Sequence, residues 1–249
     1  MNKENIYQPN NIFKTRNESA ILLILNQPLP NIKYFKLLWE NTAIHVVADG
    51  GANRLFHLFD TEQERDQYLP DFIEGDLDSL TDDVKNYYLS KNISIKKNQC
   101  QDSTDFMKCL ALPMVNKSED YIYVLGALSG RLDHTISAMH VLLLNPLKRI
   151  VLLSNDSMAF LIPIGSSTIH SCVEIEKDTC GLFPLTGKAI CFSAGLKWNL
   201  DHTLPLAFGD LISTSNAFDP NYYDENLGIR KVVLKTDREL IWTVELDLN

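Results

Sequence analysis

The sequence lacks the features of a secreted or membrane protein. Its five cysteines are an odd number and include no CxxC pair, which argues against a disulfide framework and against a zinc site. No apolar stretch reaches the ~20 residues of a membrane-spanning helix, and the first residues carry no apolar signal core. We therefore expect a soluble, cytoplasmic protein without a membrane partner.

Clusters of basic residues are also missing. The chain has 23 Lys and Arg against 32 Asp and Glu, for a net charge of -9 at pH 7. Because a polyanion binds to concentrated positive charge, no nucleic-acid partner is expected. With 249 residues, 45% of them hydrophobic, the chain can form one large domain or two smaller ones.

Several common signatures of enzyme chemistry are absent. The sequence has no G-x-x-x-x-G-K-[ST] phosphate loop, no strand that leads into G-x-G-x-x-G, and no evident Ser/His/Asp constellation. Instead, it has aspartates at the ends of several predicted strands.

Hydrophobic patterning predicts two different domains. The apolar runs 20–26 and 43–48, with a helical repeat between them, indicate buried parallel strands joined by a helix. From about residue 154 the runs become short and alternating, and the last two, joined by 236–239, predict a β-hairpin. The expected fold is an α/β N-terminal domain with a mostly parallel, Rossmann-like sheet, followed by an all-β sandwich C-terminal domain. The expected limits are a flexible lead-in over 1–18, the α/β domain over 19–160 and the sandwich over 161–249.

The stretch 121–140 combines a strand-like run, a loop bracketed by Gly126 and Gly130, and a helical repeat. Arg131 and Asp133 lie at the tip of this loop, where an α/β sheet presents its ligand-binding edge and helix N–H groups point at anions. A phosphate would be stabilised there. The alternative is that the glycines only turn the chain.

Two other strand ends finish in aspartates. Asp49 precedes two glycines, which let a ligand approach the backbone, although a helix cap is an equal explanation. Asp76 and Asp78 follow Gly75 at i and i+2, and from extended backbone their side chains would point the same way, as carboxylate ligands of Mg²⁺. The alternative is a surface turn.

A polar corner follows at 101–106, where a helix begins. Capping by one hydroxyl accounts for one polar residue. It leaves Gln101, Asp102 and Asp105 crowded together, with Lys108 one turn further on. Some of these side chains are expected to face a ligand.

The first domain thus places carboxylates at successive strand ends, on the edge where open α/β sheets bind ligands. They are Asp49, Asp76, Asp78, Asp105 and Asp133. Two such charges about 4 Å apart repel by about 4 kcal/mol at an effective dielectric of about 20, so a divalent metal is the expected partner. With Mg²⁺ bound the pocket could accept a polyphosphate, and Arg131 could hold its oxygens bidentately. Phosphoryl or pyrophosphoryl transfer therefore fits better than redox chemistry.

Five segments, in this order, resemble the successive motifs of the thiamin pyrophosphokinases: VVADGGANRL, LPDFIEGDLDSL, QDSTDF, LGALSGRLDH and GLKWNL. The resemblance covers most of residues 20–246. It implies an N-terminal catalytic domain that binds ATP and Mg²⁺, a C-terminal thiamin-binding domain, and a homodimer with its sites between subunits. It also implies that ATP and thiamin react to give thiamin diphosphate and AMP.

The resemblance also assigns roles to residues. The catalytic set would be Asp49, Asp76, Asp78, Asp105, Arg131 and Asp133, of which Asp76, Asp78 and Asp105 would bind the metal. Gln101 would lie in the polyphosphate region, and which aspartate, if any, takes the hydroxyl proton stays open. Trp198 would cover the cationic thiazolium of thiamin from the partner subunit, and Ser215 and Asn216 would contact its pyrimidine end. Without the resemblance, Trp198 would be a plug of the sandwich and Ser215 and Asn216 turn residues.

Two rival functions stay open. A Mg²⁺-dependent transferase or phosphohydrolase could act on another alcohol or nucleotide, and a module could bind thiamin or nucleotide without chemistry. The stretch 219–227 departs from the resemblance because it is longer than a simple turn, and we interpret it as a lineage-specific surface loop.

Overall fold

The computed structural model describes residues 5–248, which divide into two compact units. The first, here called the parallel unit, comprises Thr15–Leu142 and Lys148–Asn155. The second, called the β-rich unit, comprises the described residues up to Lys14, Leu143–Leu147, and the described residues from Asp156 onward. A sheet-rich fold of two domains agrees with the change in hydrophobic pattern along the sequence.

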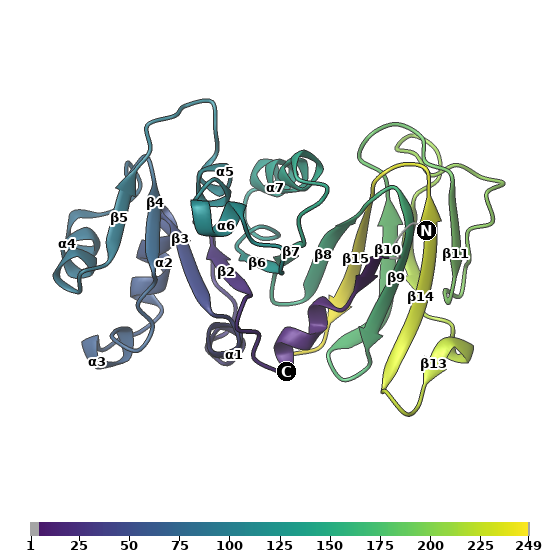
Figure 1. Cartoon of the computed structure of the whole chain (residues 1–249), viewed down its shortest axis with the longest axis horizontal. Helices are drawn as coiled ribbons and strands as arrows, with labels where there is room; N and C mark the ends of the chain where they lie inside the picture. The colour runs from purple at the N-terminus through teal and green to yellow at the C-terminus, as the bar shows by residue number, and fades with distance from the viewer. Residues whose placement is uncertain (1–4, 249) are drawn as a thin grey trace. The chain divides into compact units, whose positions relative to one another are not determined.

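Six strands among the described residues form the sheet of the parallel unit. Their order is β7 (Ile150–Leu153), β6 (Ile122–Leu125), β2 (Ile21–Ile24), β3 (Ile44–Ala48), β4 (Phe72–Gly75) and β5 (Ser94–Lys97). All neighbours are parallel, with Leu23 of β2 opposite both Val46 and Val124. Every side chain of β2, β6 and β7 is buried, which explains their continuous apolar sequences. Figure 1 shows these strands in order from β5 to β7.

Helices connect these strands: α1 (Ile32–Asn41), α2 (Asp49–His57), α3 (Glu62–Arg65), α4 (Asp82–Ser90), α5 (Asp105–Leu110), α6 (Pro113–Asn116) and α7 (Leu132–Leu144). Side-chain caps fix three of the starts, including α3, where the Thr61 hydroxyl accepts the Glu64 N–H. Asn31 accepts the Tyr34 N–H before α1, and Thr104 accepts the Met107 N–H before α5. Because the strands are parallel, the loops after β2, β3, β4 and β6 meet at one edge of the sheet.

The β-rich unit contains two groups of strands. The first has the order β1 (Asn5–Tyr7), β9 (Gly165–Cys172), β14 (Ile229–Thr236) and β11 (Cys191–Ala194), with β13 (Tyr223–Asp224) beside β14. The second has the order β12 (Ser213–Ala217), β10 (Glu176–Phe183), β15 (Leu240–Leu246) and β8 (Ser157–Ile162). Two 3-10 helices, η1 (Pro9–Phe13) and η2 (Pro220–Tyr222), complete the unit. The ring of Tyr7 in the first group stacks on Phe160 in the second, with centroids 5.3 Å apart, so the groups share a core.

The hairpin predicted across 236–239 is wrong. β14 pairs with β9 and β11, whereas β15 pairs with β10 and β8, so the two strands belong to different groups. The connecting turn is held locally, because the Thr236 hydroxyl donates to the Arg238 carbonyl and accepts the Arg238 N–H. Turn residues show where the chain reverses, but alternation does not show which sheet each strand joins.

The flexible lead-in predicted over 1–18 is wrong over Asn5–Phe13, while residues 1–4 lie outside the described part of the chain. β1 pairs in parallel with β9. Asn10 is buried, and its amide donates to the Glu176 carboxylate at 2.7 Å. The polar composition of this segment suggested a loop. Local sequence could not show that Asn10 is buried, because its partner Glu176 lies 166 positions away along the chain.

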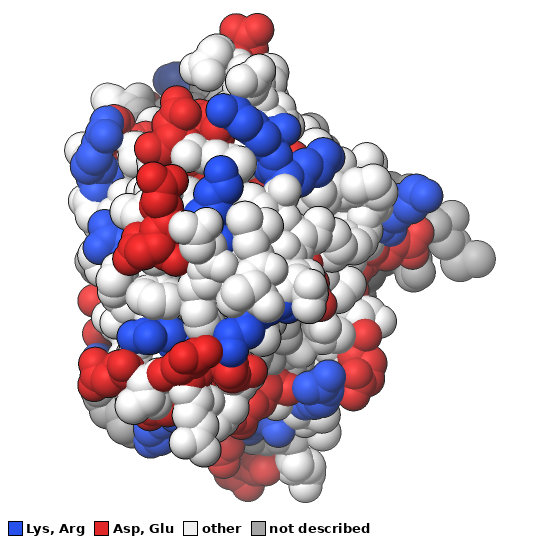
Figure 2. Space-filling model, turned by 90° about the vertical axis from the view of Figure 1, so that its left-hand side faces the viewer, with Lys and Arg blue, Asp and Glu red and all other residues white. Residues whose placement is uncertain are grey.

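Charged side chains of both signs are interspersed on the side of the parallel unit that carries α4 and β5 (Figure 2). Lys91, at the end of α4, shows the local pairing, because its ammonium lies 2.9 Å from Glu62 and 2.7 Å from Asp66. Such exposed pairs are screened by solvent and salt. Within residues 5–248, no helix has both the length and the apolar character needed to cross a membrane.

Candidate active site

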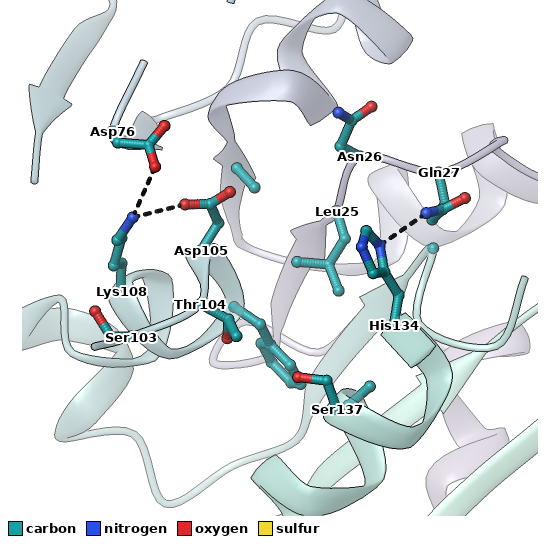
Figure 3. A pocket seen from close by; sticks show the side chains of 14 residues that line it. Leu25, Asn26, Gln27, Asp76, Ser103, Thr104, Asp105, Lys108, His134 and Ser137 are labelled. Atoms are coloured by element: carbon teal, nitrogen blue, oxygen red, sulfur yellow. Dashed lines mark hydrogen bonds and ion pairs between the residues drawn. The ribbon is translucent and has the colours of Figure 1, made fainter. Parts of the chain in front are cut away.

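A cavity of about 240 Å³ lies in the parallel unit at the carboxyl ends of its strands. Its walls come from the loops after β2, β4, β5 and β6, from the end of β3, and from the N-terminal halves of α5 and α7. Asp76, Asp105 and Lys108 lie on one side of it and Gln27 and His134 on the other (Figure 3). This is the edge at which open α/β sheets bind ligands.

The acidic side of the cavity is built around a buried lysine. The Lys108 ammonium lies 3.0 Å from an Asp105 carboxylate oxygen and 3.3 Å from one of Asp76, and its side chain is only 3% exposed. Burial opposes the charge on Lys108, but hydrogen bonds and attraction from Asp105 and Asp76 outweigh it and hold its pKa above the ordinary value. The pKa of Asp76 is lowered, chiefly because its carboxylate accepts the Asp78 N–H and then because of Lys108.

Asp49 adds a third carboxyl group to this cluster. It is the first residue of α2 and is 1% exposed, and its oxygens accept the N–H groups of Gly50 and Ser79. Burial raises its pKa, and the nearby charges of Asp105 and Asp76 raise it further. A Cβ on Gly75 would lie 2.7 Å from Cγ of Asp49, so only glycine leaves room for Asp49 at this position.

Five of the predicted site residues in the parallel unit do not line the cavity, and one of them, Asp49, is buried beside it. Asp78, Gln101, Arg131 and Asp133 are exposed. The Arg131 guanidinium pairs with the Asp133 carboxylate two residues away, and the pair lowers the pKa of Asp133. The expectation that Asp76 and Asp78 project together fails because Leu77 has a φ of 68°, so the backbone between them is not extended.

The carboxylates at the cavity suit a cation that takes only some of its ligands from the protein. Among residues 5–248, no group of three or more His, Cys, Asp or Glu side chains is arranged to hold a metal ion. Asp76 and Asp105, however, come from different elements and meet at one positive charge. Mg²⁺ is usually bound by one or two carboxylates, with water and substrate phosphates completing its shell.

The opposite side of the cavity carries an amide and an imidazole. The Gln27 amide lies 3.0 Å from Nδ1 of His134, and Gln27 is 9% exposed. Gly130, with a φ of 75°, allows this approach, because a Cβ there would lie 1.8 Å from the Gln27 amide oxygen. Sequence reasoning assigned no role to Gln27, although it follows the apolar run 20–26 directly and so had to lie at this edge.

In the β-rich unit, Trp198 is 55% exposed and therefore does not plug the core. The Lys197 ammonium lies over its indole ring, 4.6 Å from the ring centroid, in a cation–π contact. The buried Asn216 side chain accepts the Trp198 N–H and donates to the Trp198 carbonyl at 2.9 Å, which fixes the backbone that presents the ring. Ser215 is exposed, with a φ of 55°. The structure thus brings Trp198 and Asn216 together.

Two family models match the chain. The model described as "Thiamin pyrophosphokinase, catalytic domain" matches residues 35–152, and the one described as "Thiamin pyrophosphokinase, vitamin B1 binding domain" matches residues 166–224. Together they cover parts of both units and every candidate site residue named in this subsection except Gln27.

Individual proteins agree with these matches. The chain is 42% identical to thiamine pyrophosphokinase 3 of Oryza sativa subsp. japonica, over 90% of this chain and 86% of that protein. It is 36% identical to thiamine pyrophosphokinase 1 of Arabidopsis thaliana, over 90% and 85%. Among solved structures, thiamin pyrophosphokinase from Candida albicans superposes with a TM-score of 0.82 at 27% identity, covering 98% of this chain and 93% of that one.

Proposed function

The chain belongs to the thiamin pyrophosphokinase family, and we propose that its parallel unit binds ATP with Mg²⁺ and its β-rich unit supplies contacts to thiamin. The enzyme transfers the pyrophosphoryl group of ATP to the thiamin hydroxyl, giving thiamin diphosphate and AMP. It is therefore an ATP-dependent transferase.

The observation that carries the proposed ATP site is the meeting of Asp76 and Asp105 on one ammonium group in the cavity. These two carboxylates would hold Mg²⁺, and the buried Asp49 adds negative charge that favours a cation. Bound there, Mg²⁺ would neutralise negative charge on the phosphate oxygens. Asp78, the third predicted metal ligand, donates its N–H to Asp76 and so orients that carboxylate.

We propose an in-line displacement at the β-phosphorus of ATP. The thiamin hydroxyl oxygen forms the new bond to the β-phosphorus and releases its proton to a carboxylate of the site or to water. The bond from the β-phosphorus to the bridging oxygen of the α-phosphate breaks, and AMP leaves with that oxygen. ATP is too large for a cavity of about 240 Å³, so the exposed residues Gln101, Arg131 and Asp133 would meet the part of the polyphosphate that extends beyond it. Most of the acceleration then comes from positioning and charge neutralisation.

Trp198, Ser215 and Asn216 are proposed as the thiamin contacts. The exposed indole face suits a cationic ring, and Asn216 holds the Trp198 backbone in place.

We also propose a homodimer with its sites between subunits, since Leu204 and Phe208 of the β-rich unit are 63% and 64% exposed. Apolar side chains exposed in this way are typical of interaction surfaces.

Two finer assignments rest on the same basis. We propose a Rossmann-like arrangement for the parallel unit, because of its all-parallel strand order, and a β-sandwich for the β-rich unit, because its two groups of strands share a core. We propose the cytoplasm as its compartment, since all five cysteines are free and four of them are buried.

The test is product formation by the purified enzyme. Protein, Mg²⁺, ATP and thiamin are incubated, and AMP and thiamin diphosphate are quantified by chromatography, with a control without thiamin. Equal amounts of both products, lost in Asp76→Asn, would support the reaction and the acidic site together. Trp198→Ala should raise the KM for thiamin about 2- to 30-fold, as a lost cation–π contact predicts, while the KM for ATP stays unchanged.

The rival functions predict other results. AMP or ADP release without thiamin would favour a hydrolase or a transferase with another acceptor. Tight thiamin binding without turnover would favour a binding module.

A further inference from the structure

Lys108 is the most deeply buried cation at the candidate site. Its side chain is 3% exposed, it lines the cavity, and its ammonium bridges Asp105 at 3.0 Å and Asp76 at 3.3 Å. A lysine is almost never buried to this extent unless it is paired. Its charge therefore compensates two carboxylates that would otherwise repel each other.

The two halves of this bridge differ in origin. Lys108 and Asp105 lie three residues apart on α5, so the geometry of the helix keeps them together. Asp76 comes from the loop after β4, so its contact with Lys108 ties that loop to the helix. The contact with Asp76 is thus the part of the bridge that the helix does not enforce.

We propose that Lys108 is a resident counter-ion of the Asp76–Asp105 pair, which a divalent cation has to displace from at least one carboxylate, and that it thereby sets the affinity of the enzyme for that cation. This inference rests on the proposed metal site. Lys108 is then a positioning residue for the metal: it keeps the carboxylates close together before the cation arrives and competes with the cation for their oxygens. Because α5 holds Lys108 beside Asp105, the contact with Asp76 is the one that yields.

The chain offers a matched control in Lys91. Its ammonium also bridges two carboxylates, of Glu62 and Asp66, at 2.9 and 2.7 Å. Its side chain is 22% exposed, the pair lies outside the cavity, and both carboxylates are more exposed than Asp76 or Asp105. Lys91→Met removes the same kind of bridge where no cation is expected to bind.

The experiment measures cation binding directly, without ATP or thiamin. Mn²⁺ is titrated into wild type, Lys108→Met and Lys91→Met, and free Mn²⁺ is followed by electron paramagnetic resonance. Thermal unfolding of each protein is recorded in chelator and in saturating Mn²⁺. We expect Lys108→Met to bind Mn²⁺ about tenfold more tightly than wild type, because a competing positive charge is removed from two facing carboxylates. In chelator the Tm of Lys108→Met should be lower than that of wild type. Saturating Mn²⁺ should raise the Tm of Lys108→Met by more than it raises the Tm of wild type.

Lys91→Met should bind Mn²⁺ as wild type does. Lys108→Arg, which keeps the charge, should bind it no more tightly than wild type. Unchanged or weaker Mn²⁺ binding by Lys108→Met would overturn the proposal. If Lys108→Met does not fold, Lys108→Gln, which keeps hydrogen-bond donors but not the charge, is measured in the same way and against the same expectation. Wild type that forms thiamin diphosphate while Lys108→Met fails this test would refute the inference alone, whereas wild type without product would refute the proposed function.

Discussion

Two arrangements of acid and base lie at the carboxyl edge of the parallel unit, and they differ in nearly every physical respect. In the first, Asp76 and Asp105 meet the buried Lys108 across two elements of the fold. In the second, Arg131, directly before α7, pairs with Asp133 in the first turn of that helix, and the side chains are 68% and 63% exposed. The first centres on a buried ammonium and joins a loop to a helix. The second is in solvent and joins neighbours in sequence, so it adds little to the fold.

The comparison indicates where the chemistry is concentrated. Removing one partner of a buried pair leaves an uncompensated charge, at a cost of about 3–5 kcal/mol. An exposed pair can open at little cost, so Arg131 can leave Asp133 for a phosphate oxygen. The buried cluster is therefore suited to fixing a cation, and the exposed pair to adapting to a ligand.

The largest expected effect comes from Asp105→Asn. It removes a carboxylate from the buried cluster, and we expect kcat/KM for ATP to fall about 10²- to 10³-fold, as for the loss of one preorganised electrostatic group. Asp133→Asn, at the exposed pair, should cost at least tenfold less. Initial rates of AMP formation measure both variants. Equal losses would remove the functional distinction between the two arrangements.

A smaller effect is expected from Gly75→Ala, which disturbs the cluster without changing its charge. The new Cβ would lie 2.7 Å from Cγ of Asp49, so we expect about 1–3 kcal/mol of lost stability, together with lower activity. Gly187→Ala is the control, since Gly187 has a φ of 63° but no atom within 4 Å of the added Cβ. It should cost about 1 kcal/mol through backbone strain alone and leave activity intact. Denaturant unfolding and initial rates separate the two, and full activity in Gly75→Ala would show that the position of Asp49 is not critical.

The smallest effect concerns the pH dependence of stability. Arg131 lowers the pKa of Asp133 below 3.8, so this pair stabilises the fold above that pH and the contribution is lost as the pH falls through the folded pKa. Burial raises the pKa of Asp49, so its contribution is present below 3.8 and lost as the pH rises through the folded pKa. Going from neutral pH to below 3.8, the Tm of Asp133→Asn should approach that of wild type from below. The Tm of Asp49→Asn relative to wild type should instead decrease over the same range. If the difference in Tm from wild type changed with pH in the same way for both variants, the exposed, ion-paired environment of Asp133 and the buried environment of Asp49 would be contradicted.

Hydrophobic patterning predicted the elements that are buried on both faces. The apolar runs 20–26 and 43–48 contain β2 and β3, because strands covered on both sides need continuous apolar sequence. Since such strands are parallel, the sequence also predicted the edge at which Asp49, Asp76 and Asp105 gather. Local sequence could not reveal the left-handed backbone at Leu77, which turns Asp78 out to solvent.

Features that depend on distant partners were missed. The role of Lys108 depends on Asp76, 32 positions away, and that of Gln27 on His134, 107 positions away. The partners of β14 and β15 were missed for the same reason, since each strand pairs with segments that local alternation does not identify. Periodicity reports which face of an element is buried, but not what covers it.

The pairing of β1 with β9 has a consequence for how the chain is made. The sequence of the parallel unit lies between these two strands, so a ribosome releases β1 long before β9 exists. The parallel unit can complete its sheet on the nascent chain while β1 is still unpaired. The β-rich unit closes only after β14 and β15 have been synthesised. Premature termination before that point would leave a folded parallel unit with β1 unpaired at its N-terminal side.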